Sequence, residues 1–309
     1  MSRPPNDGLA GLPTEGHRAD LLDLDLRSTR ELVDLINAED RTVPESVGSA
    51  GDALAAAIDE IVERLRGGGR LVYAGAGSSG RLAAVDAAEC GPTFGAADGQ
   101  VIALVAGGAN AAPAEQEAAE DDEAAGARDL AAVGVGPLDA VILLSASGRT
   151  PWTLGALAQA QRAGALIVAV VSVPGSELGS GAAHEIAVEV GPEVVSGSTR
   201  MKAGTAQKLV LNTISTVTMV RLGKTFGNLM VDVQASNEKL RARARRTVAL
   251  ATGADEREVD EAVAGADGDA KVAIVLLLAG VDAATARSRL DAAGGVVRRA
   301  LLEAADVVR

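Results

Sequence analysis

Two short segments combine glycine with serine in a way that suits the binding of an anion. Residues 75–80 read GAGSSG, which matches G-x-G-x-x-G and places Ser78 and Ser79 directly before Gly80. The second segment reads SASGRT, and its residues of interest are Ser145, Ser147, Gly148, Arg149 and Thr150. Each segment follows an apolar run and precedes a helical pattern. Free N–H groups at a helix N-terminus and neutral serine hydroxyls can both donate to a phosphate group.

A dinucleotide-binding function fails the test of sequence context. Such a site needs an acidic residue roughly 20 positions further on, at the end of the second strand. Here that strand, VIALVA, ends in Gly107 and Gly108, and Asp98 lies before it. Each turn by itself is explained by a tight strand-to-helix connection, in which Thr150 is the N-cap and Pro151 the first helical residue. Two such turns in one sheet favour a phosphorylated small molecule.

The elements that position these turns are predicted to form an α/β fold. Five short apolar runs indicate strands, and they cover residues 71–74, 101–106, 140–147, 165–173 and 185–190. The first four are almost continuously apolar, as expected for strands buried on both faces. Helical segments separate them, so the pattern predicts a five-stranded parallel sheet flanked by helices. Both turns then lie at the carboxyl ends of strands, where open α/β sheets bind ligands.

Helices are predicted before and after the sheet. Ser28 is the expected N-cap of a first helix, and an amphipathic stripe from Leu54 to Leu65 predicts a second, which ends at Gly67. A long helix follows Ser196 and stops near Gly223. From about residue 237 the chain is helical again. We therefore expect an N-terminal helical segment (1–55), a sheet domain (56–228) and a C-terminal helical region (229–309).

Composition excludes several classes of partner. The net charge is −13, and the chain has only one Trp, one Tyr and two Phe. Nucleic-acid binding, which needs a basic surface and usually aromatic stacking, is not expected. No apolar run reaches the roughly 20 residues of a membrane span, and the first residues lack the apolar core of a secretory signal. Cys90 is the only cysteine and there are two histidines, so we expect no disulfide, metal or cofactor, and a cytoplasmic location.

Longer blocks of the sequence resemble a known family. SASGRT is similar to the phosphosugar-binding turn of the SIS (sugar isomerase) domain, which has a five-stranded parallel sheet. The chain as a whole resembles the N-acetylmuramic acid 6-phosphate etherase family. The blocks that carry this resemblance are TEGHR, INAEDRTVP, GGRLVYAGAGSSGRLAAVDAAECGPTFG, AEDDEAAG, SASGRTPW, SGSTRMKAGTAQKLVLN and GKTFGNLMVDVQASNEKL. They cover nearly the whole chain, least clearly its first dozen residues and its helical end.

Two glutamates gain a role only through this resemblance. Glu89 by itself looks like a surface residue at a helix end, and Glu120 lies in an acidic run with Glu117 one turn earlier. The resemblance implies that Glu89, in E-C-x-P-T, and Glu120, in A-E-D, are catalytic; Gly91 stands where the family commonly has proline. We expect the apolar surroundings of Glu89 to raise its pKa, which would make it the acid and Glu120 the base.

The reaction that the resemblance implies is cleavage of the D-lactyl ether of N-acetylmuramate 6-phosphate with water. Its products are N-acetylglucosamine 6-phosphate and D-lactate, formed by elimination and then hydration. Ser198 and Lys202, at the start of the long helix, are further substrate-binding candidates, and Arg200 could supply a cation. SIS domains usually pair, so we expect a homodimer with the site near the subunit interface. The alternatives are an SIS aldose–ketose isomerase and a non-catalytic sensor resembling the glucokinase regulatory protein.

Overall fold

A computed structural model describes residues 12–108, 113–232 and 238–302 of the chain. It divides into two compact units. The first contains residues 1–87 and 99–215, and the second contains residues 88–98 and 216–309. The sheet lies in the first unit, and the second is built mainly of helices. Among the described residues, no helix is both long enough and apolar enough to cross a membrane.

The five predicted strands form one parallel sheet in the order β2-β1-β3-β4-β5. Their bounds are β1 (Leu71–Gly75), β2 (Val101–Val105), β3 (Ala140–Leu144), β4 (Leu166–Val171) and β5 (His184–Ala187). Strands β1, β3 and β4 are buried along their whole length, which explains their continuous apolar sequence. β3 ends before Ser145, so the serines predicted at its end belong to the turn that follows it. The predicted fold class is confirmed.

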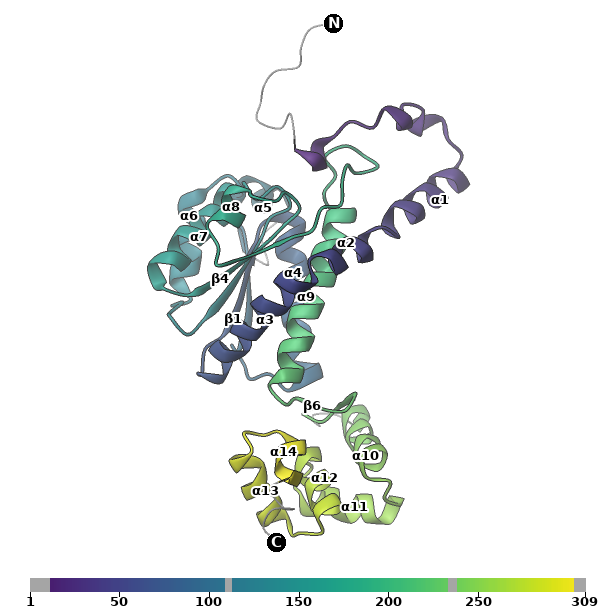
Figure 1. The fold of residues 1–309 in the computed structure, drawn as a ribbon, viewed down its shortest axis with the longest axis vertical. Coiled ribbons are helices and arrows are strands. Elements are labelled where there is room, and N and C mark those ends of the chain that lie inside the picture. Colours follow the sequence, from purple (N-terminus) through teal and green to yellow (C-terminus); the bar gives the residue numbers. More distant parts are fainter. Residues whose placement is uncertain (1–11, 109–112, 233–237, 303–309) are drawn as a thin grey trace, which may run out of the picture. The chain divides into compact units, whose positions relative to one another are not determined.

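Helices cover both faces of this sheet (Figure 1). The first unit contains three short 3₁₀ helices, η1 (Pro13–Glu15), η2 (Ala19–Leu21) and η3 (Leu24–Leu26). Its α-helices, two of which continue into the second unit, are α1 (Thr29–Asp40), α2 (Val43–Ser49), α3 (Gly51–Arg66), α4 (Gly77–Phe94), α5 (Pro113–Ala119), α6 (Glu123–Ala132), α7 (Pro151–Ala163), α8 (Glu177–Ser180) and α9 (Lys202–Arg221). Ser28 is the N-cap of α1, as predicted, and forms a capping box with Glu31, whereas α2 was not predicted.

α3 packs on one face of the sheet and α7 on the other, and different local features of the sequence allow each contact. α3 buries the predicted apolar stripe, including Ile58 and Ile61, against β3, β4 and β5. On the other side the fully buried Trp152 of α7 packs in a core cluster with residues of the sheet. α6 and α7 approach closely because two glycines face backbone: a side chain on Gly126 would clash with Trp152 O, and one on Gly155 with Glu123 O. These contacts hold the carboxyl ends of the strands in fixed positions.

A buried carboxylate joins three elements of the first unit. Asp86, on α4, is only 5% exposed. It accepts hydrogen bonds from Tyr73 Oη on β1 (2.9 Å) and from Asn212 Nδ2 (2.6 Å) and Ser215 Oγ (3.1 Å) on α9. A buried ion is tolerated when donors replace its lost hydration. This network therefore fixes α4 against both β1 and α9.

Replacing Asp86 with alanine should lower the free energy of unfolding by about 3 kcal/mol, because three donors lose their buried acceptor. Urea denaturation measures this loss. Asp98→Ala, at an exposed turn position, is the matched control and should stay near wild type. A loss at Asp86 no larger than that of the control would contradict the structural role of the network.

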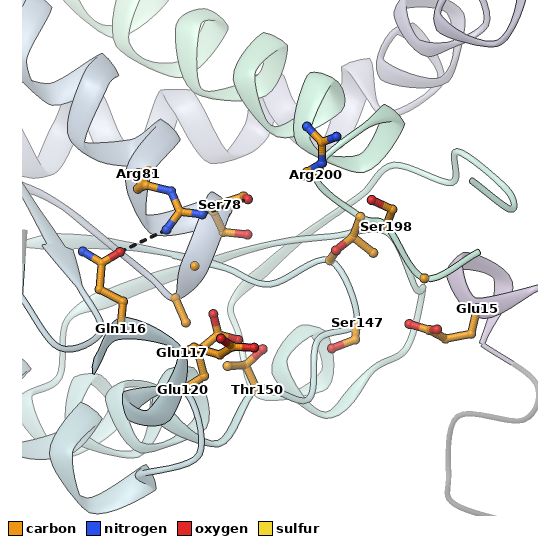
Figure 2. Close-up of a pocket in the computed structure, with 16 residues that line it drawn as sticks. Glu15, Ser78, Arg81, Gln116, Glu117, Glu120, Ser147, Thr150, Ser198 and Arg200 are labelled. Atoms are coloured by element: carbon orange, nitrogen blue, oxygen red, sulfur yellow. Dashed lines mark hydrogen bonds between the residues drawn. The ribbon is translucent and has the colours of Figure 1, made fainter. Parts of the chain in front are cut away.

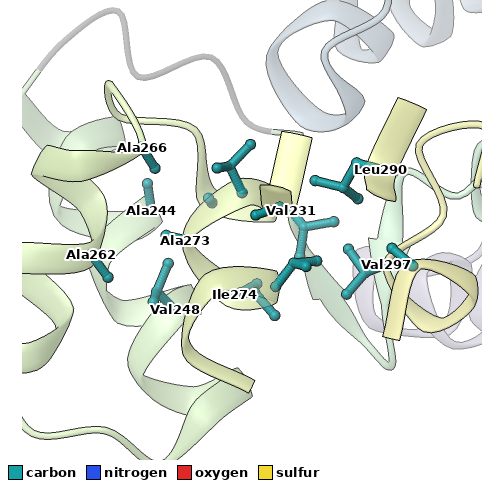
Figure 3. Close-up of a cluster of buried hydrophobic side chains, with 14 of the residues drawn as sticks. Val231, Ala244, Val248, Ala262, Ala266, Ala273, Ile274, Leu290 and Val297 are labelled. Atoms are coloured by element: carbon teal, nitrogen blue, oxygen red, sulfur yellow. The ribbon is translucent and has the colours of Figure 1, made fainter. Parts of the chain in front are cut away.

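The second unit has its own hydrophobic core. It contains a hairpin, β6 (Thr225–Phe226) with β7 (Leu229–Met230), and the helices α10 (Glu238–Thr252), α11 (Glu256–Gly265), α12 (Ala270–Ala279), α13 (Ala283–Ala292) and α14 (Val297–Leu302). Figure 3 shows Ala273 and Ile274 of α12 in the cluster, with Val248 and Val297 from α10 and α14. Lys271, at the start of α12, pairs with Asp232 at 2.6 Å. The predicted C-terminal helices are confirmed in the described residues.

Candidate active site

A pocket of about 530 Å³ lies where the two glycine- and serine-rich turns meet (Figure 2). Five segments far apart in the sequence line it. Three of them come from the sheet region: the β1–α4 turn (Ala76, Gly77, Ser78, Ser79 and Arg81), α5 with the turn after it (Gln116, Glu117 and Glu120), and the β3–α7 turn (Ala146, Ser147 and Thr150). The other two are η1, which contributes Glu15, and the loop before α9, which contributes Gly197 to Arg200. Of the predicted site residues, Ser78, Ser79, Glu120, Ser147, Thr150 and Ser198 are together here.

The first turn presents the N-terminus of α4 to the pocket. The helix begins at Gly77, whose φ of +53° is a left-handed conformation that glycine adopts readily. Ser78 and Ser79 follow in its first turn, and Ser79 Oγ donates to Gln207 Oε1 on α9 at 2.9 Å. Gly80 does not line the pocket; it lets α4 pack on β1, because a side chain there would clash with Gly75 O. Thus the glycine pattern brings the N-terminus of α4 to the pocket.

The second turn separates residues that face the pocket from residues that shape the backbone. Ser145 is 3% exposed, accepts a hydrogen bond from Gly148 N at 3.0 Å and lies 2.9 Å from Thr150 Oγ1. Gly148 has a φ of +67° and packs against Ser176. Arg149 is exposed and is not in the lining. Ser147 and Thr150 are left to present hydroxyls to the pocket.

Glu120 lies in the turn between α5 and α6. Its backbone carbonyl accepts a hydrogen bond from Trp152 N at 3.0 Å, which ties this turn to α7. A side chain at Gly77 would clash with Glu120 Oε1, so a glycine is needed where the carboxylate meets the start of α4. Burial raises the pKa of Glu120 above its usual value; the charge of Arg81 acts the other way, and Asp121 and Glu117 add to the rise.

Arg81 links the first turn to α5. Its Nη1 donates to Gln116 Oε1 at 3.0 Å, and its Nη2 donates to Ser78 Oγ at 3.2 Å. Gln116 is buried and in turn donates to Gly108 O at 3.0 Å. The guanidinium group is therefore held at the pocket wall, where it can balance negative charge from Glu120 or from a ligand.

The loop before α9 forms the next wall, but Lys202 does not join it. Lys202 is 4% exposed and pairs with Glu39 of α1 at 2.7 Å, and Glu39 also pairs with Arg18. The buried Glu193 accepts hydrogen bonds from Lys202 N and Ala203 N, both at 3.0 Å. The carboxylate of Glu193 therefore caps the start of α9.

Glu89 is not among the residues that line the pocket. It lies in the last turns of α4, in the share of that helix that belongs to the second unit, and its side chain is exposed. Val85, one turn earlier on α4, is 64% exposed. The side chain of Glu89 thus lies in solvent in the single chain and not in the apolar surroundings that were expected. Its role as the acid stays a prediction.

Several lining residues were not predicted as part of the site, and three of them, Glu15, Arg81 and Gln116, carry polar side chains from different segments. Arg81 directly follows the G-x-G-x-x-G match, Glu15 belongs to the TEGHR block, and Gln116 lies three residues before the AEDDEAAG block. Of these three residues, only Glu15 could have been predicted to line the site, because the TEGHR block lies outside the sheet and is nevertheless shared with the family. Among the described residues, no three His, Cys, Asp or Glu side chains are grouped to hold a metal ion. The lining offers hydroxyl, amide, guanidinium and carboxylate groups.

Comparison with known proteins defines the class first. Residues 53–161 match the family described as glucokinase regulatory protein N-terminal SIS domain, and residues 119–216 match the SIS domain. The parallel sheet with its site at the carboxyl ends of β1 and β3 is thus that of an SIS-domain protein.

Curated relatives define the family within this class. The N-acetylmuramic acid 6-phosphate etherase of Rubrobacter xylanophilus is 55% identical over 298 residues, which is 96% of this chain and 98% of the relative. The protein of the same name from Streptomyces avermitilis is 51% identical, covering 96% and 95% of the two chains. That from Vibrio atlanticus is 44% identical, covering 95% and 96%. The chain belongs to the N-acetylmuramic acid 6-phosphate etherase family.

Proposed function

We propose that this protein is an N-acetylmuramic acid 6-phosphate etherase, a carbon–oxygen lyase that releases D-lactate from its substrate. The observation that carries this is full-length identity of about one half to etherases from several organisms, combined with a pocket lined by two hydroxyl-bearing turns. The substrate is a phosphorylated amino sugar, and the pathway is the catabolism of N-acetylmuramate. The products are N-acetylglucosamine 6-phosphate and D-lactate.

The pocket supports a definite way of binding the phosphate. Ser78 and Ser79 at the start of α4 and Ser147 and Thr150 before α7 present hydroxyl groups and helix N-termini. Ser145 and Gly148 shape the second turn rather than contact the ligand. Ser198 lies on the wall beside them. Arg81 and Arg200 are the cations of the lining and can meet the anionic groups of the substrate.

The chemistry follows from the weakness of an ether as an electrophile. Opening of the sugar to its aldehyde makes the C2 proton acidic, because it lies next to a carbonyl group. A carboxylate then removes this proton, and the electron pair left at C2 forms a C2–C3 double bond and expels the lactyl oxygen as a carboxylic acid protonates it. Water adds to the resulting double bond with the two groups in reversed roles. General acid–base catalysis of this kind contributes about 10²–10⁴-fold for each group.

Glu120 is the proposed base. It lines the pocket, and burial raises its pKa toward neutrality, which makes it a stronger base than an ordinary carboxylate. Glu89 is the proposed acid. Glu89 is exposed in the single chain, so a further surface is needed to enclose it together with a bound sugar.

A homodimer with its site near the subunit interface provides such a surface. α1 buries none of its residues, although Leu32, Leu35 and Ile36 share one face. Leu22 and Leu26, just before it, are 71% and 82% exposed. Apolar groups on this scale at one end of a chain are typical of a contact with another protein. We propose that a second copy of the chain covers residues 22–36 and the exposed face of α4 that carries Val85 and Glu89.

The proposal also includes the division of the chain into parts and its location in the cell. The N-terminal helical segment (1–55), the SIS domain (56–228) and the C-terminal helical region (229–309) are proposed as three functional parts of the chain. A cytoplasmic location is proposed because Cys90 is the only cysteine of the sequence, so that no disulfide forms within the chain, as is usual in a reducing compartment.

The decisive experiment is to incubate the protein with N-acetylmuramate 6-phosphate and to measure D-lactate by an enzyme-coupled assay. Release of D-lactate together with N-acetylglucosamine 6-phosphate is expected. Tight binding of sugar phosphates without lactate release would instead support a sensor resembling the glucokinase regulatory protein. Interconversion of an aldose and a ketose phosphate would support an isomerase.

Replacing Arg81 with methionine should shift the pH dependence of kcat/KM in a direction that reveals the role of Glu120. The charge of Arg81 lowers the pKa of Glu120, so its loss raises that pKa further. A base is inactive when protonated, so the acidic limb of the profile should move to higher pH. Movement of the basic limb instead would make Glu120 the acid. Arg128→Met, an exposed position on α6, is the control.

A further inference from the structure

Glu15 brings a carboxylate to the pocket from a segment that lies outside the SIS fold. It is the last residue of η1, and Figure 2 shows its side chain extending toward the side of the pocket where Ser147 lies. Within the described residues its carboxylate forms no hydrogen bond or ion pair. An unpaired, partly buried carboxylate that faces a ligand pocket has lost part of its hydration without any compensation from the protein. A donor from a ligand would supply it.

The protein holds this segment in place by contacts on both sides of Glu15. Ser196 Oγ donates to Glu15 O at 3.1 Å, and Gly197 N donates to Thr14 O at 3.3 Å. Thr14 is 1% exposed. Further along, Arg18 pairs with Glu39, which also pairs with the buried Lys202 at the start of α9. The backbone of Glu15 is therefore fixed relative to the loop that carries Ser198.

A glycine makes room for the Glu15 side chain, as another does for Glu120. A methyl group added at Gly197 would lie 2.6 Å from Glu15 Oε2, and one added at Gly77 would clash with Glu120 Oε1. Both glycines have positive φ, +75° and +53°. Glu15 and Glu120, two of the three glutamates that line the pocket, thus each lie against a glycine of a facing segment.

We propose that Glu15 is a substrate-positioning residue whose carboxylate accepts a hydrogen bond from an uncharged donor of the sugar, a hydroxyl or amide N–H group. This rests on the proposed etherase function. The phosphate group itself is not the partner of this carboxylate, because two anions repel each other at contact distance. Glu15 therefore orients the sugar so that its phosphate points to the serine turns.

The test is isothermal titration of Glu15→Ala and Glu15→Gln with N-acetylglucosamine 6-phosphate and, separately, with inorganic phosphate. The alanine variant should bind the sugar phosphate at least about tenfold more weakly, as expected for a lost hydrogen bond to a charged group. The glutamine variant should lose less, because its amide oxygen still accepts. Affinity for inorganic phosphate should not fall in either. Glu45→Ala and Glu45→Gln, at an exposed glutamate of α2, are the matched controls.

Steady-state kinetics test the role of Glu15 a second time. In D-lactate release, Glu15→Ala should raise KM by more than it lowers kcat, and Gly197→Ala, which displaces the carboxylate without removing it, should do the same. Unchanged sugar-phosphate affinity in Glu15→Ala, or an equal loss for inorganic phosphate, overturns the role of Glu15. If the wild type releases D-lactate, such a result concerns Glu15 alone. If the wild type neither releases D-lactate nor binds the sugar phosphate, the proposed function fails, and this inference fails with it.

Discussion

Glu120→Gln should abolish D-lactate release, with a loss of at least about 10³-fold in kcat, and should also abolish exchange of the C2 hydrogen of the substrate with deuterium from solvent. Glutamine has the shape of glutamate but cannot take up the C2 proton. No later step can then proceed, because the carbanion that expels lactate is never formed. The measurements are the coupled lactate assay and proton NMR of the substrate in heavy water.

Glu123→Gln is the matched control for this variant. It makes the same chemical change three positions further on, at an exposed residue in the first turn of α6 that does not line the pocket. It should retain both activities. Deuterium exchange that survives in Glu120→Gln would show that another group removes the C2 proton.

Glu89→Gln should abolish D-lactate release by a similar factor while leaving C2 deuterium exchange detectable. The proposed acid is lost, so the lactyl oxygen cannot be protonated, yet Glu120 still removes and returns the C2 proton. The same two measurements separate the steps. Glu63→Gln, an exposed glutamate on α3, is the control. Loss of exchange together with lactate release would contradict this division of roles.

Mixing the two inactive variants tests whether Glu89 and Glu120 of one site come from different subunits. After co-refolding, half of the dimers contain one chain of each kind, and a shared site would restore full chemistry at one of their two sites. Activity of about a quarter of wild type is then expected. If dimers that are shown to be mixed remain inactive, both glutamates of a site come from one chain.

The sequence by itself determined the sheet, the two turns and the family. Buried parallel strands are continuous apolar runs, and a strand-to-helix turn of Gly and Ser is a local pattern, so β1 to β5 and the turns at Ser78 and Ser147 were predictable. The resemblance to the etherase family came from long ordered blocks. Each of these signals depends on residues close together in the chain.

Only the tertiary structure decided which polar residues reach the pocket. Ser145 and Ser147 look equivalent in the sequence, yet Ser145 is buried in the turn and Ser147 faces the ligand site. Lys202 does not line the pocket and instead pairs with Glu39, which lies 163 positions earlier in the chain. Glu15 enters the pocket through a contact with Ser196, 181 positions away. The raised pKa of Glu120 has the same origin, since desolvation depends on what packs around a carboxyl and no local pattern records it.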